Sequence, residues 1–552
     1  MKHKNILTPW QRLLGLLKLE KRAVMQVFYY AIFAGLVSLS LPLGIQAIIN
    51  LIQGAQITTS WIVLVILVTL GVSFAGVLQL MQIRIIESIQ QRVFTRASFE
   101  FTFRFPKIQM NELRNHYPPE LANRFFDTIA VQKGFAKILV DVPSAVLQIL
   151  FALILLSFYH PFFIIFGVLL LLLVFIVFKF TASRGMLTSL EESKHKYRVA
   201  HWIQEVARSV VSFKLSGKTS LALDKNDELV NDYLDARESH FKILVIQFIQ
   251  MISFKVIVTA GLLIVGGFLV LNQEMNIGQF VAAEIIILLV ITSVEKLILG
   301  LESFYDILTS LEKIGQVVDK DLENQTGETP VFKDNFTIEL KDVTYNVSGR
   351  DKEILKDINL KIPARSSLLI SGESGSGKSS LLRLIAGVIK PTKGSIFLDN
   401  FSLNSLHLNK YRSNIGLSLS EETPFEGTLR ENITFGDPAI VDEDIFWAIE
   451  NVGLTEYVKQ QPKGLSTFIN PEGKQLSFTK SKKIILARAI VTKPKVLILE
   501  DPLDQFEAEE AAKVMDFLTS KENPWTLIVV SSNERWRNAC NTTVVLKNGQ
   551  TI

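Results

Sequence analysis

Six long apolar runs occupy the first part of this chain and limit it to folds that place helices in a membrane. They cover residues 24–52, 60–81, 142–159, 162–180, 246–271 and 280–300. About 20 apolar residues in a helix cross the roughly 30 Å hydrocarbon core of a bilayer. Core helices of a soluble protein are shorter and less continuous, which excludes that alternative. Pro42 lies inside the first run and predicts a kink there, because proline lacks the backbone N–H that a helix interior needs.

The charged residues between the runs predict their orientation. Lys and Arg cluster before the first run, and segments 84–139 and 181–243 are rich in both, whereas the connections 53–60, 160–161 and 272–278 contain neither. Because positively charged segments stay on the cytoplasmic side, we expect six spans with both chain ends in the cytoplasm. The first run is too long to be the apolar part of a cleavable signal peptide.

Ionisable residues fall inside the predicted spans, among them Lys255, Glu284 and Glu295. Lys255 and Glu295 are expected at similar depth near the cytoplasmic side, where they could pair within the bundle. Glu284 is expected nearer the outer face and is the better candidate for lining a path through the membrane.

A glycine-rich segment in the second half matches the P-loop pattern G-x-x-x-x-G-K-[ST] at every fixed position. An apolar strand candidate at 368–370 leads into it, and a helix candidate at 380–386 leads out. In such loops the backbone N–H groups surround phosphate oxygens, the lysine reaches the outer phosphates, and the serine hydroxyl ligates Mg²⁺. The predicted nucleotide-binding residues here are Gly372, Glu373, Ser374, Gly375, Ser376, Gly377, Lys378, Ser379 and Ser380.

Two carboxylates end a later run of aliphatic residues. The run 496–499 has the composition of a buried parallel strand, and Glu500 and Asp501 follow it directly. Such a strand delivers acidic groups beside the P-loop. We expect Glu500 to join Ser379 in the Mg²⁺ shell and Asp501 to orient the attacking water, so both are catalytic candidates.

Between these motifs, the segment 476–480 (LSFTK) precedes the helix-like run 484–490. With the motifs above, this region resembles ABC transporters, in particular half-size exporters that fuse one membrane domain to one nucleotide-binding domain. The membrane part and the phrase 427–433 (GTLRENI) are similar to exporters of type 1 secretion and bacteriocin or peptide export. The resemblance implies a six-helix membrane domain followed by an α/β P-loop domain of the ABC type.

The resemblance also implies how such a chain is organised and what it binds. We expect a cytoplasmic segment at 1–22, the membrane domain at 23–318, a linker at 319–333 and the nucleotide-binding domain at 334–552. The segments 117–132 and 205–217 are similar to the coupling regions of the family. The implied cofactors are ATP and Mg²⁺, and each ATP is held between the P-loop of one copy and the signature segment, including Ser477, of the other. The partners are therefore a second half-transporter, in a homodimer or heterodimer, and membrane lipid.

The chain departs from the family at the signature segment. Where the family has L-S-G-G-Q, this chain retains Leu476 and Ser477 but continues with Phe478, Thr479 and Lys480. The glycines allow the backbone to approach the γ-phosphate of the ATP held opposite, and side chains there obstruct that approach. Phe478 is the largest obstacle, whereas Lys480 could offer a substitute cation.

Further departures affect the other groups that the family places around the γ-phosphate. The family has Asp and then Glu where this chain has Glu500 and then Asp501, so the base is one methylene shorter. Ser420 stands for the family's glutamine, Ser532 for its histidine, and Val347 for the aromatic that stacks on adenine. The segment 504–507 reads DQFE where the family has SALD, and Tyr345 lies two residues before Val347.

These residues favour two functions. The first is an ATP-coupled exporter subunit in the plasma membrane of a bacterium, with its nucleotide-binding domain in the cytoplasm. The alternative is a pseudo-ATPase that binds Mg-ATP, hydrolyses it slowly, and acts as the structural or regulatory partner of a competent half. The net charge of +4 gives no reason to expect a nucleic-acid partner, and a single cysteine, Cys540, excludes a disulfide within the chain. The residues leave the exported substrate unidentified, and we expect no leader-peptidase domain before the first span.

Overall fold

The computed structural model describes residues 7–53, 59–114, 116–332, 335–347 and 352–552. Its chain divides into two compact units, and each is described by itself. The first unit contains residues up to Lys107 together with Asn115–Lys320, and the second contains Ile108–Arg114 together with Asp321–Ile552. The short segment Ile108–Arg114 thus belongs to the second unit, although it lies between the second and third predicted spans in the sequence.

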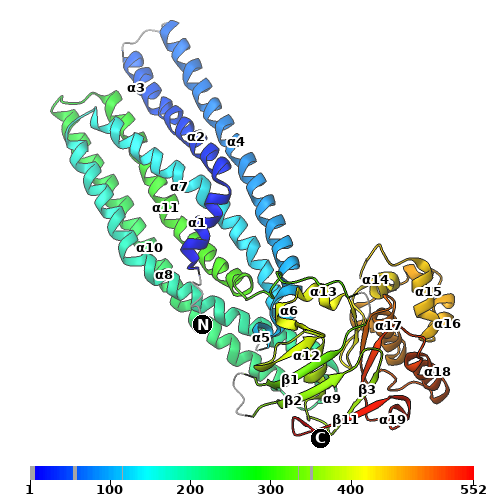
Figure 1. The fold of residues 1–552 in the computed structure, drawn as a ribbon. Coiled ribbons are helices and arrows are strands. Elements are labelled where there is room, and N and C mark those ends of the chain that lie inside the picture. Colours follow the sequence, from blue (N-terminus) through cyan, green and yellow to red (C-terminus); the bar gives the residue numbers. More distant parts are fainter. Residues whose placement is uncertain (1–6, 54–58, 115, 333–334, 348–351) are drawn as a thin grey trace. The chain divides into compact units, whose positions relative to one another are not determined.

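The first unit is helical (Figure 1). Long helices α7 and α11 lie along each other, as do α8 and α10. The helices of this unit are α1 (Pro9–Leu19), α2 (Lys21–Ser38), α3 (Ser40–Gln53), α4 (Thr59–Arg104), η1 (Phe105–Lys107), α6 (Pro118–Ala122), η2 (Asn123–Phe126), α7 (Asp127–Ser157), α8 (Phe162–Arg208), α9 (Val210–Leu215), α10 (Leu221–Leu271) and α11 (Ile277–Val318).

Burial on these helices suits an apolar solvent. Small and β-branched residues of α11, such as Ala282, Ala283 and Val290, are fully buried between neighbouring helices. Many large aliphatic side chains of this unit are exposed, and Leu80 and Ile264 are 66% and 71% exposed. In water this distribution would be unfavourable, whereas in lipid the outward aliphatic surface is solvated and small residues allow close helix packing.

Among the described residues, five helical segments are long and apolar enough to cross a membrane. They are Lys21–Gln53, Thr59–Lys107, Pro118–Ser157, Leu221–Leu271 and Ile277–Val318. The fourth predicted run lies on α8. Among the described residues, the apolar part of this helix is the shorter segment Phe162–Leu172. The number of six spans therefore stays a prediction.

Two expectations for the spans can be compared with the structure. The first run is divided at Leu39 into α2 and α3, and Pro42 lies in the first turn of α3, where a missing N–H breaks no helical bond. The interruption thus precedes the proline. The pairing of Lys255 with Glu295 is confirmed, with 2.6 Å between Nζ and Oε2 across α10 and α11.

The second unit is built around two sheets. A four-stranded antiparallel sheet has the order β2-β1-β4-β5, and a six-stranded sheet has the order β12-β11-β3-β10-β9-β6, in which all neighbours except β11 and β12 are parallel. The strands are β1 (Ile338–Tyr345), β2 (Leu355–Ile362), β3 (Ser367–Ser371), β4 (Lys393–Leu398), β5 (Phe401–Ser402), β6 (Ile415–Ser418), β7 (Gly427–Thr428), β8 (Phe468–Ile469), β9 (Val496–Glu500), β10 (Thr526–Val530), β11 (Thr542–Lys547) and β12 (Gln550–Thr551).

Helices complete this unit and bury both faces of the parallel sheet. Every residue of β9 and β10 is buried, as expected for strands covered on both sides. The helices are α5 (Met110–Leu113), α12 (Lys378–Ile385), η3 (Leu403–Ser405), α13 (Leu408–Arg412), α14 (Leu429–Thr434), α15 (Asp442–Asn451), α16 (Thr455–Gln460), η4 (Gly464–Ser466), η5 (Pro471–Gly473), α17 (Phe478–Ile490), α18 (Ala508–Thr519) and α19 (Arg535–Ala539).

Candidate nucleotide-binding site

The P-loop connects strand β3 to helix α12, as its pattern requires. Gly377 precedes the helix with φ of +102°, and a Cβ there would lie 2.8 Å from Cδ2 of Leu355, so only glycine fits. The Lys378 ammonium donates to the carbonyl oxygens of Gly372 and Glu373, each at 2.8 Å. The loop therefore holds a cation at the N-terminus of α12, where the helix dipole also favours an anion.

The sheet register explains why the carboxylates reach this loop. Val530 of β10 pairs with Ile370 of β3 on one side and with Glu500 of β9 on the other. Because the three strands are parallel, their carboxyl ends meet at one edge. The Ser379 hydroxyl donates a hydrogen bond to Oε1 of Glu500, and the Ser420 N–H donates to Oε2 at 3.3 Å. The two predicted Mg²⁺ ligands are thus in direct contact.

Asp501 lies next to this pair in a constrained backbone conformation. Its φ is +44°, and its N–H donates to the carbonyl of Val530 at 2.8 Å. Burial raises the pKa of the Asp501 carboxyl, and the nearby carboxylates of Asp504 and Glu500 act in the same direction. A carboxyl whose pKa is raised is a better proton acceptor when ionised, which suits a group that orients and activates water.

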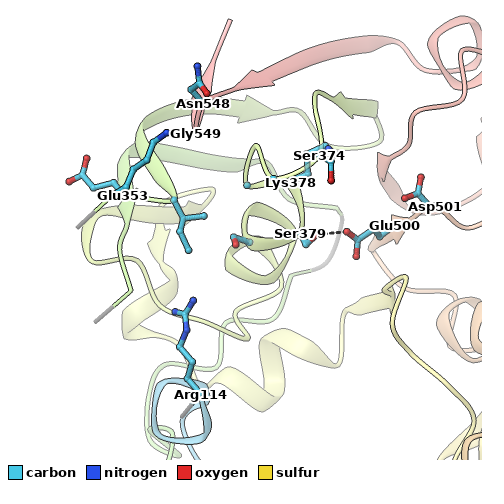
Figure 2. A pocket seen from close by; sticks show the side chains of 14 residues that line it. Arg114, Glu353, Ser374, Lys378, Ser379, Glu500, Asp501, Asn548 and Gly549 are labelled. Atoms are coloured by element: carbon cyan, nitrogen blue, oxygen red, sulfur yellow. Dashed lines mark hydrogen bonds between the residues drawn. The ribbon is translucent and has the colours of Figure 1, made fainter. Parts of the chain in front are cut away.

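A cavity of about 550 Å³ opens over the P-loop (Figure 2). Its volume is within the range of small-ligand pockets. The residues that line it are Arg114, Lys352, Glu353, Ile354, Ser374, Gly375, Gly377, Lys378, Ser379, Ser380, Glu500, Asp501, Asn548 and Gly549. Six of the predicted nucleotide-binding residues are in this set, whereas Gly372, Glu373 and Ser376 are not among the lining residues. In the part of the chain that the structure describes, the buried Oγ of Ser376 has no hydrogen-bond partner.

The residues present fit a magnesium nucleoside triphosphate. Exposed loop N–H groups, the Lys378 ammonium and the α12 N-terminus provide positive potential for phosphates. The hydroxyl of Ser379 and the carboxylate of Glu500 are oxygen ligands of the kind that Mg²⁺ binds.

Two family profiles match the chain on either side of this arrangement. The profile described as "ABC transporter transmembrane region" matches residues 24–294, and the profile described as "ABC transporter" matches residues 355–504. The chain belongs to the ABC transporter family. It is an integral membrane member in which a transmembrane domain is fused to an ABC ATPase domain, a domain type that implies ATP binding, and half-transporters of this family generally dimerise.

Similar proteins include exporters and flippases. The chain is 29% identical over 303 residues to the alpha-hemolysin translocation ATP-binding protein HlyB of Escherichia coli O157:H7, covering 55% of this chain and 43% of that protein. It is 25% identical over 373 residues to an ATP-dependent lipid A-core flippase of Idiomarina loihiensis, covering 67% and 62%. The matched regions span about half the length of the first such relatives.

One solved structure shows the same fold over nearly the whole chain. The structure of a bacterial Atm1-family ABC exporter with ATP bound superposes with a TM-score of 0.86, covering 97% of this chain and 95% of the other at 15% identity. The predicted fold class, a helical transmembrane domain joined to an α/β ABC domain, is confirmed.

The signature segment of this ABC chain lies away from the cavity and is held by its own contacts. Ser477 caps α17, with its hydroxyl accepting from the N–H of Lys480 at 3.3 Å. Phe478 is 48% exposed, and the Thr479 hydroxyl donates to the carbonyl of Gln505 at 3.1 Å. The Lys480 ammonium, considered above as a substitute cation, lies 4.8 Å from the centre of the Tyr457 ring.

The other residues that differ from the family pattern lie in different environments. Ser420 and Ser532 are exposed, and Ser420 reaches Glu500 through its backbone alone. Val347 is buried at 6% exposure and does not line the cavity. Neither serine supplies a long side chain that could reach a γ-phosphate from its position.

Two residues of this region were missed by the sequence reasoning. Arg114 lines the cavity from the segment between the second and third spans, far from every motif. Lys482 is buried behind the carboxylates, and its ammonium donates to the carbonyls of Leu419, at 3.0 Å, and Ser420. The position of Lys482 next to the apolar residues of α17 was a signal in the sequence for its burial. No local sequence pattern pointed to Arg114.

Proposed function

We propose that this chain is one half of an ATP-dependent exporter of a bacterial plasma membrane, with its nucleotide-binding domain in the cytoplasm. The observation that carries the proposal is the contact between Ser379 and Glu500 beneath the P-loop of a chain whose other half has membrane-spanning helices. Type 1 secretion proteins and lipid flippases among its relatives support outward transport.

The residues of the site have distinct roles in this function. Lys378 and the loop N–H groups bind the phosphates, Ser379 and Glu500 would hold Mg²⁺, and Asp501 would orient water. Ser477 and its neighbours would face the nucleotide of a second half-transporter, in a homodimer or a heterodimer. Closing that dimer around nucleotide would move the membrane helices through the coupling segments 117–132 and 205–217.

Binding and assembly are tested on the full-length chain in lipid nanodiscs. Affinity for Mg-ATP is measured by fluorescence competition for the chain and for Lys378→Ala, with the exposed Lys474→Ala as a matched control. We expect Lys378→Ala to lower affinity by about 10- to 100-fold, since a charged donor contributes about 1.5–3 kcal/mol per hydrogen bond. Absence of Lys378-dependent binding, or a strictly monomeric chain in lipid with ATP, would overturn the proposal.

A second candidate is favoured by the exposed Phe478 and the two serines at the glutamine and histidine positions. We propose that the chain hydrolyses ATP slowly by itself and serves as the structural or regulatory half of a pair. Phe478 would obstruct the approach to the partner's γ-phosphate, and the shorter Asp501 would hold water about 1 Å from the productive place, a shift that costs on the order of a hundredfold in rate.

Turnover distinguishes the two candidates. Robust hydrolysis by the chain alone, lost in Lys378→Ala, would reject the slow-hydrolysis proposal. The combined substitution Phe478→Gly, Thr479→Gly, Lys480→Gln, Asp501→Glu and Ser532→His should raise turnover by about a hundredfold or more if these departures cause the defect. An unchanged rate, with Mg-ATP binding intact, would show that another feature limits hydrolysis.

A further inference from the structure

The base end of the nucleotide cavity has no aromatic residue among the described residues that line it, which exclude 348–351. The position at which the resemblance places a stacking aromatic holds Val347, whose side chain is buried in the core. Tyr345, two residues earlier, is 4% exposed and also points into that core. A base held here therefore needs a different planar or apolar surface.

Arg114 reaches this end of the cavity from a segment that is anchored to the same unit. Ile108 forms an antiparallel bridge with Leu322, and the N–H of Gln109 donates to the carbonyl of Asp321 at 2.9 Å. Nη1 of Arg114 then donates to the hydroxyl of Tyr345 at 3.2 Å. A buried tyrosine thus fixes one edge of an otherwise exposed guanidinium.

Tyr345 also connects Arg114 to a second residue that lines the cavity. Its backbone carbonyl accepts from the N–H of Ile354 at 2.9 Å, and Ile354 lines the cavity with a half-buried aliphatic side chain. An aliphatic surface and a planar cation therefore lie at the same end, both positioned by one buried residue. Such a pair suits the two faces of an aromatic heterocycle.

The direction of a bound nucleotide follows from the site. Figure 2 shows Glu500 and Asp501 on one side of Lys378 and Ser379, and Arg114 and Glu353 on the other. Phosphates at the P-loop with their terminal group toward the carboxylates leave the base to extend toward Arg114. The guanidinium is then on the base side of the cavity.

We propose that Arg114 binds the base of a purine nucleoside triphosphate by placing its guanidinium plane on the ring, with Tyr345 as the positioning residue. This inference rests on the proposed ATP-binding function and deepens it. Arginine suits the role because its planar, weakly hydrated cation stacks on aromatic faces, which a lysine ammonium does not do.

The test separates base contacts from phosphate contacts. Full-length chain in nanodiscs is titrated with a fluorescent ATP analogue, which is then displaced by ATP or by inorganic tripolyphosphate. We expect Arg114→Ala to lower ATP affinity by about 2- to 30-fold and to leave tripolyphosphate affinity unchanged. Arg114→Lys should show most of the loss and Tyr345→Phe a smaller one, while the exposed Arg537→Ala, on α19, should match the unsubstituted chain.

The outcomes distinguish this inference from the proposed function. Unchanged ATP affinity in Arg114→Ala, together with Lys378-dependent binding, would overturn the inference alone. Equal losses for ATP and tripolyphosphate would also overturn it, since Arg114 would then act on phosphates or on the fold of the site. Absence of any Lys378-dependent ATP binding would overturn the proposed function itself.

Discussion

Removal of the Lys482 ammonium should loosen the region behind the carboxylates. Lys482 is 4% exposed, and its Nζ donates to the carbonyl oxygens of Leu419 and Ser420, which follow strand β6. Burial lowers the pKa of this ammonium, and the carboxylates of Glu422 and Glu500 act in the opposite direction. The lysine is thus a buried cation that neutralises part of an acidic cluster and connects α17 to the loop after β6.

The size of the effect follows from these contacts. Lys482→Met retains an unbranched apolar chain and removes only the charged donor. Each hydrogen bond from a charged group contributes about 1.5–3 kcal/mol, and loss of one partner from a buried charged cluster costs about 3–5 kcal/mol. Because the lysine's own desolvation is relieved at the same time, we expect a net local loss of about 3 kcal/mol, or roughly a hundredfold in an opening equilibrium.

Hydrogen exchange followed by mass spectrometry measures this opening in the full-length chain. Peptides that cover Phe478–Ile490 and the residues after β6 should exchange about a hundredfold faster in Lys482→Met, while peptides from β10 change much less. Lys474→Met is the matched control, since that side chain is 74% exposed. Protection within about threefold of the unsubstituted chain would refute the assignment of Lys482 as a stabilising buried cation.

Three further predictions concern single residues. Burial raises the pKa of the Asp501 carboxyl, so above pH 3.8 the folded chain binds more protons than the unfolded chain and loses stability as the pH rises. Asp501→Asn should therefore raise the melting temperature at pH 7, and this difference should vanish below pH 3.8. An unchanged or lower melting temperature at pH 7 would contradict the prediction. Burial raises the pKa of the Cys540 thiol to about 11, so about one part in ten thousand is thiolate at pH 7. Maleimide labelling of this thiol in the folded chain should be slow, and its rate should rise about tenfold per pH unit up to pH 10. Fast, pH-independent labelling would contradict this prediction. Gly377→Ala should lower Mg-ATP affinity by at least tenfold in a fluorescence titration, because a Cβ there meets Leu355 at a φ that disfavours alanine, and retained affinity would argue against this loop conformation.

The local patterns predicted much of the molecule because the relevant interactions are local or solvent-driven. Apolar run lengths depend on transfer to lipid, so the membrane half could be predicted without tertiary information. The P-loop depends on backbone conformation at Gly377 and on a strand and a helix on either side, and both neighbours were where the residues placed them. The break in the first run lies at Leu39, three residues before Pro42, because a proline ring in a continuous helix clashes with the carbonyl of the residue four positions earlier, here Ser38.

Contacts between distant segments were outside the reach of those patterns. The contact between Ser379 and Glu500 could be predicted only through the P-loop motif. The contact itself depends on strands β3 and β9, which both pair with β10 at Val530. Arg114 belongs to no motif, and its place depends on the packing of Ile108–Arg114 with the rest of the second unit. Side chains far apart in the chain meet only when long-range packing selects one arrangement.

The amino-acid sequence by itself determined that one half of this chain has helices apolar enough for a lipid bilayer and that the other half contains a P-loop. Both properties depend on short segments, because the transfer of apolar side chains to lipid and the backbone freedom of glycine are local effects. Only the tertiary structure determined which side chains surround the P-loop. It brought the Lys482 ammonium to the carbonyl oxygens after β6 and Arg114 to the cavity over the P-loop. Both positions result from burial and hydrogen bonding between segments that no short-range pattern connects.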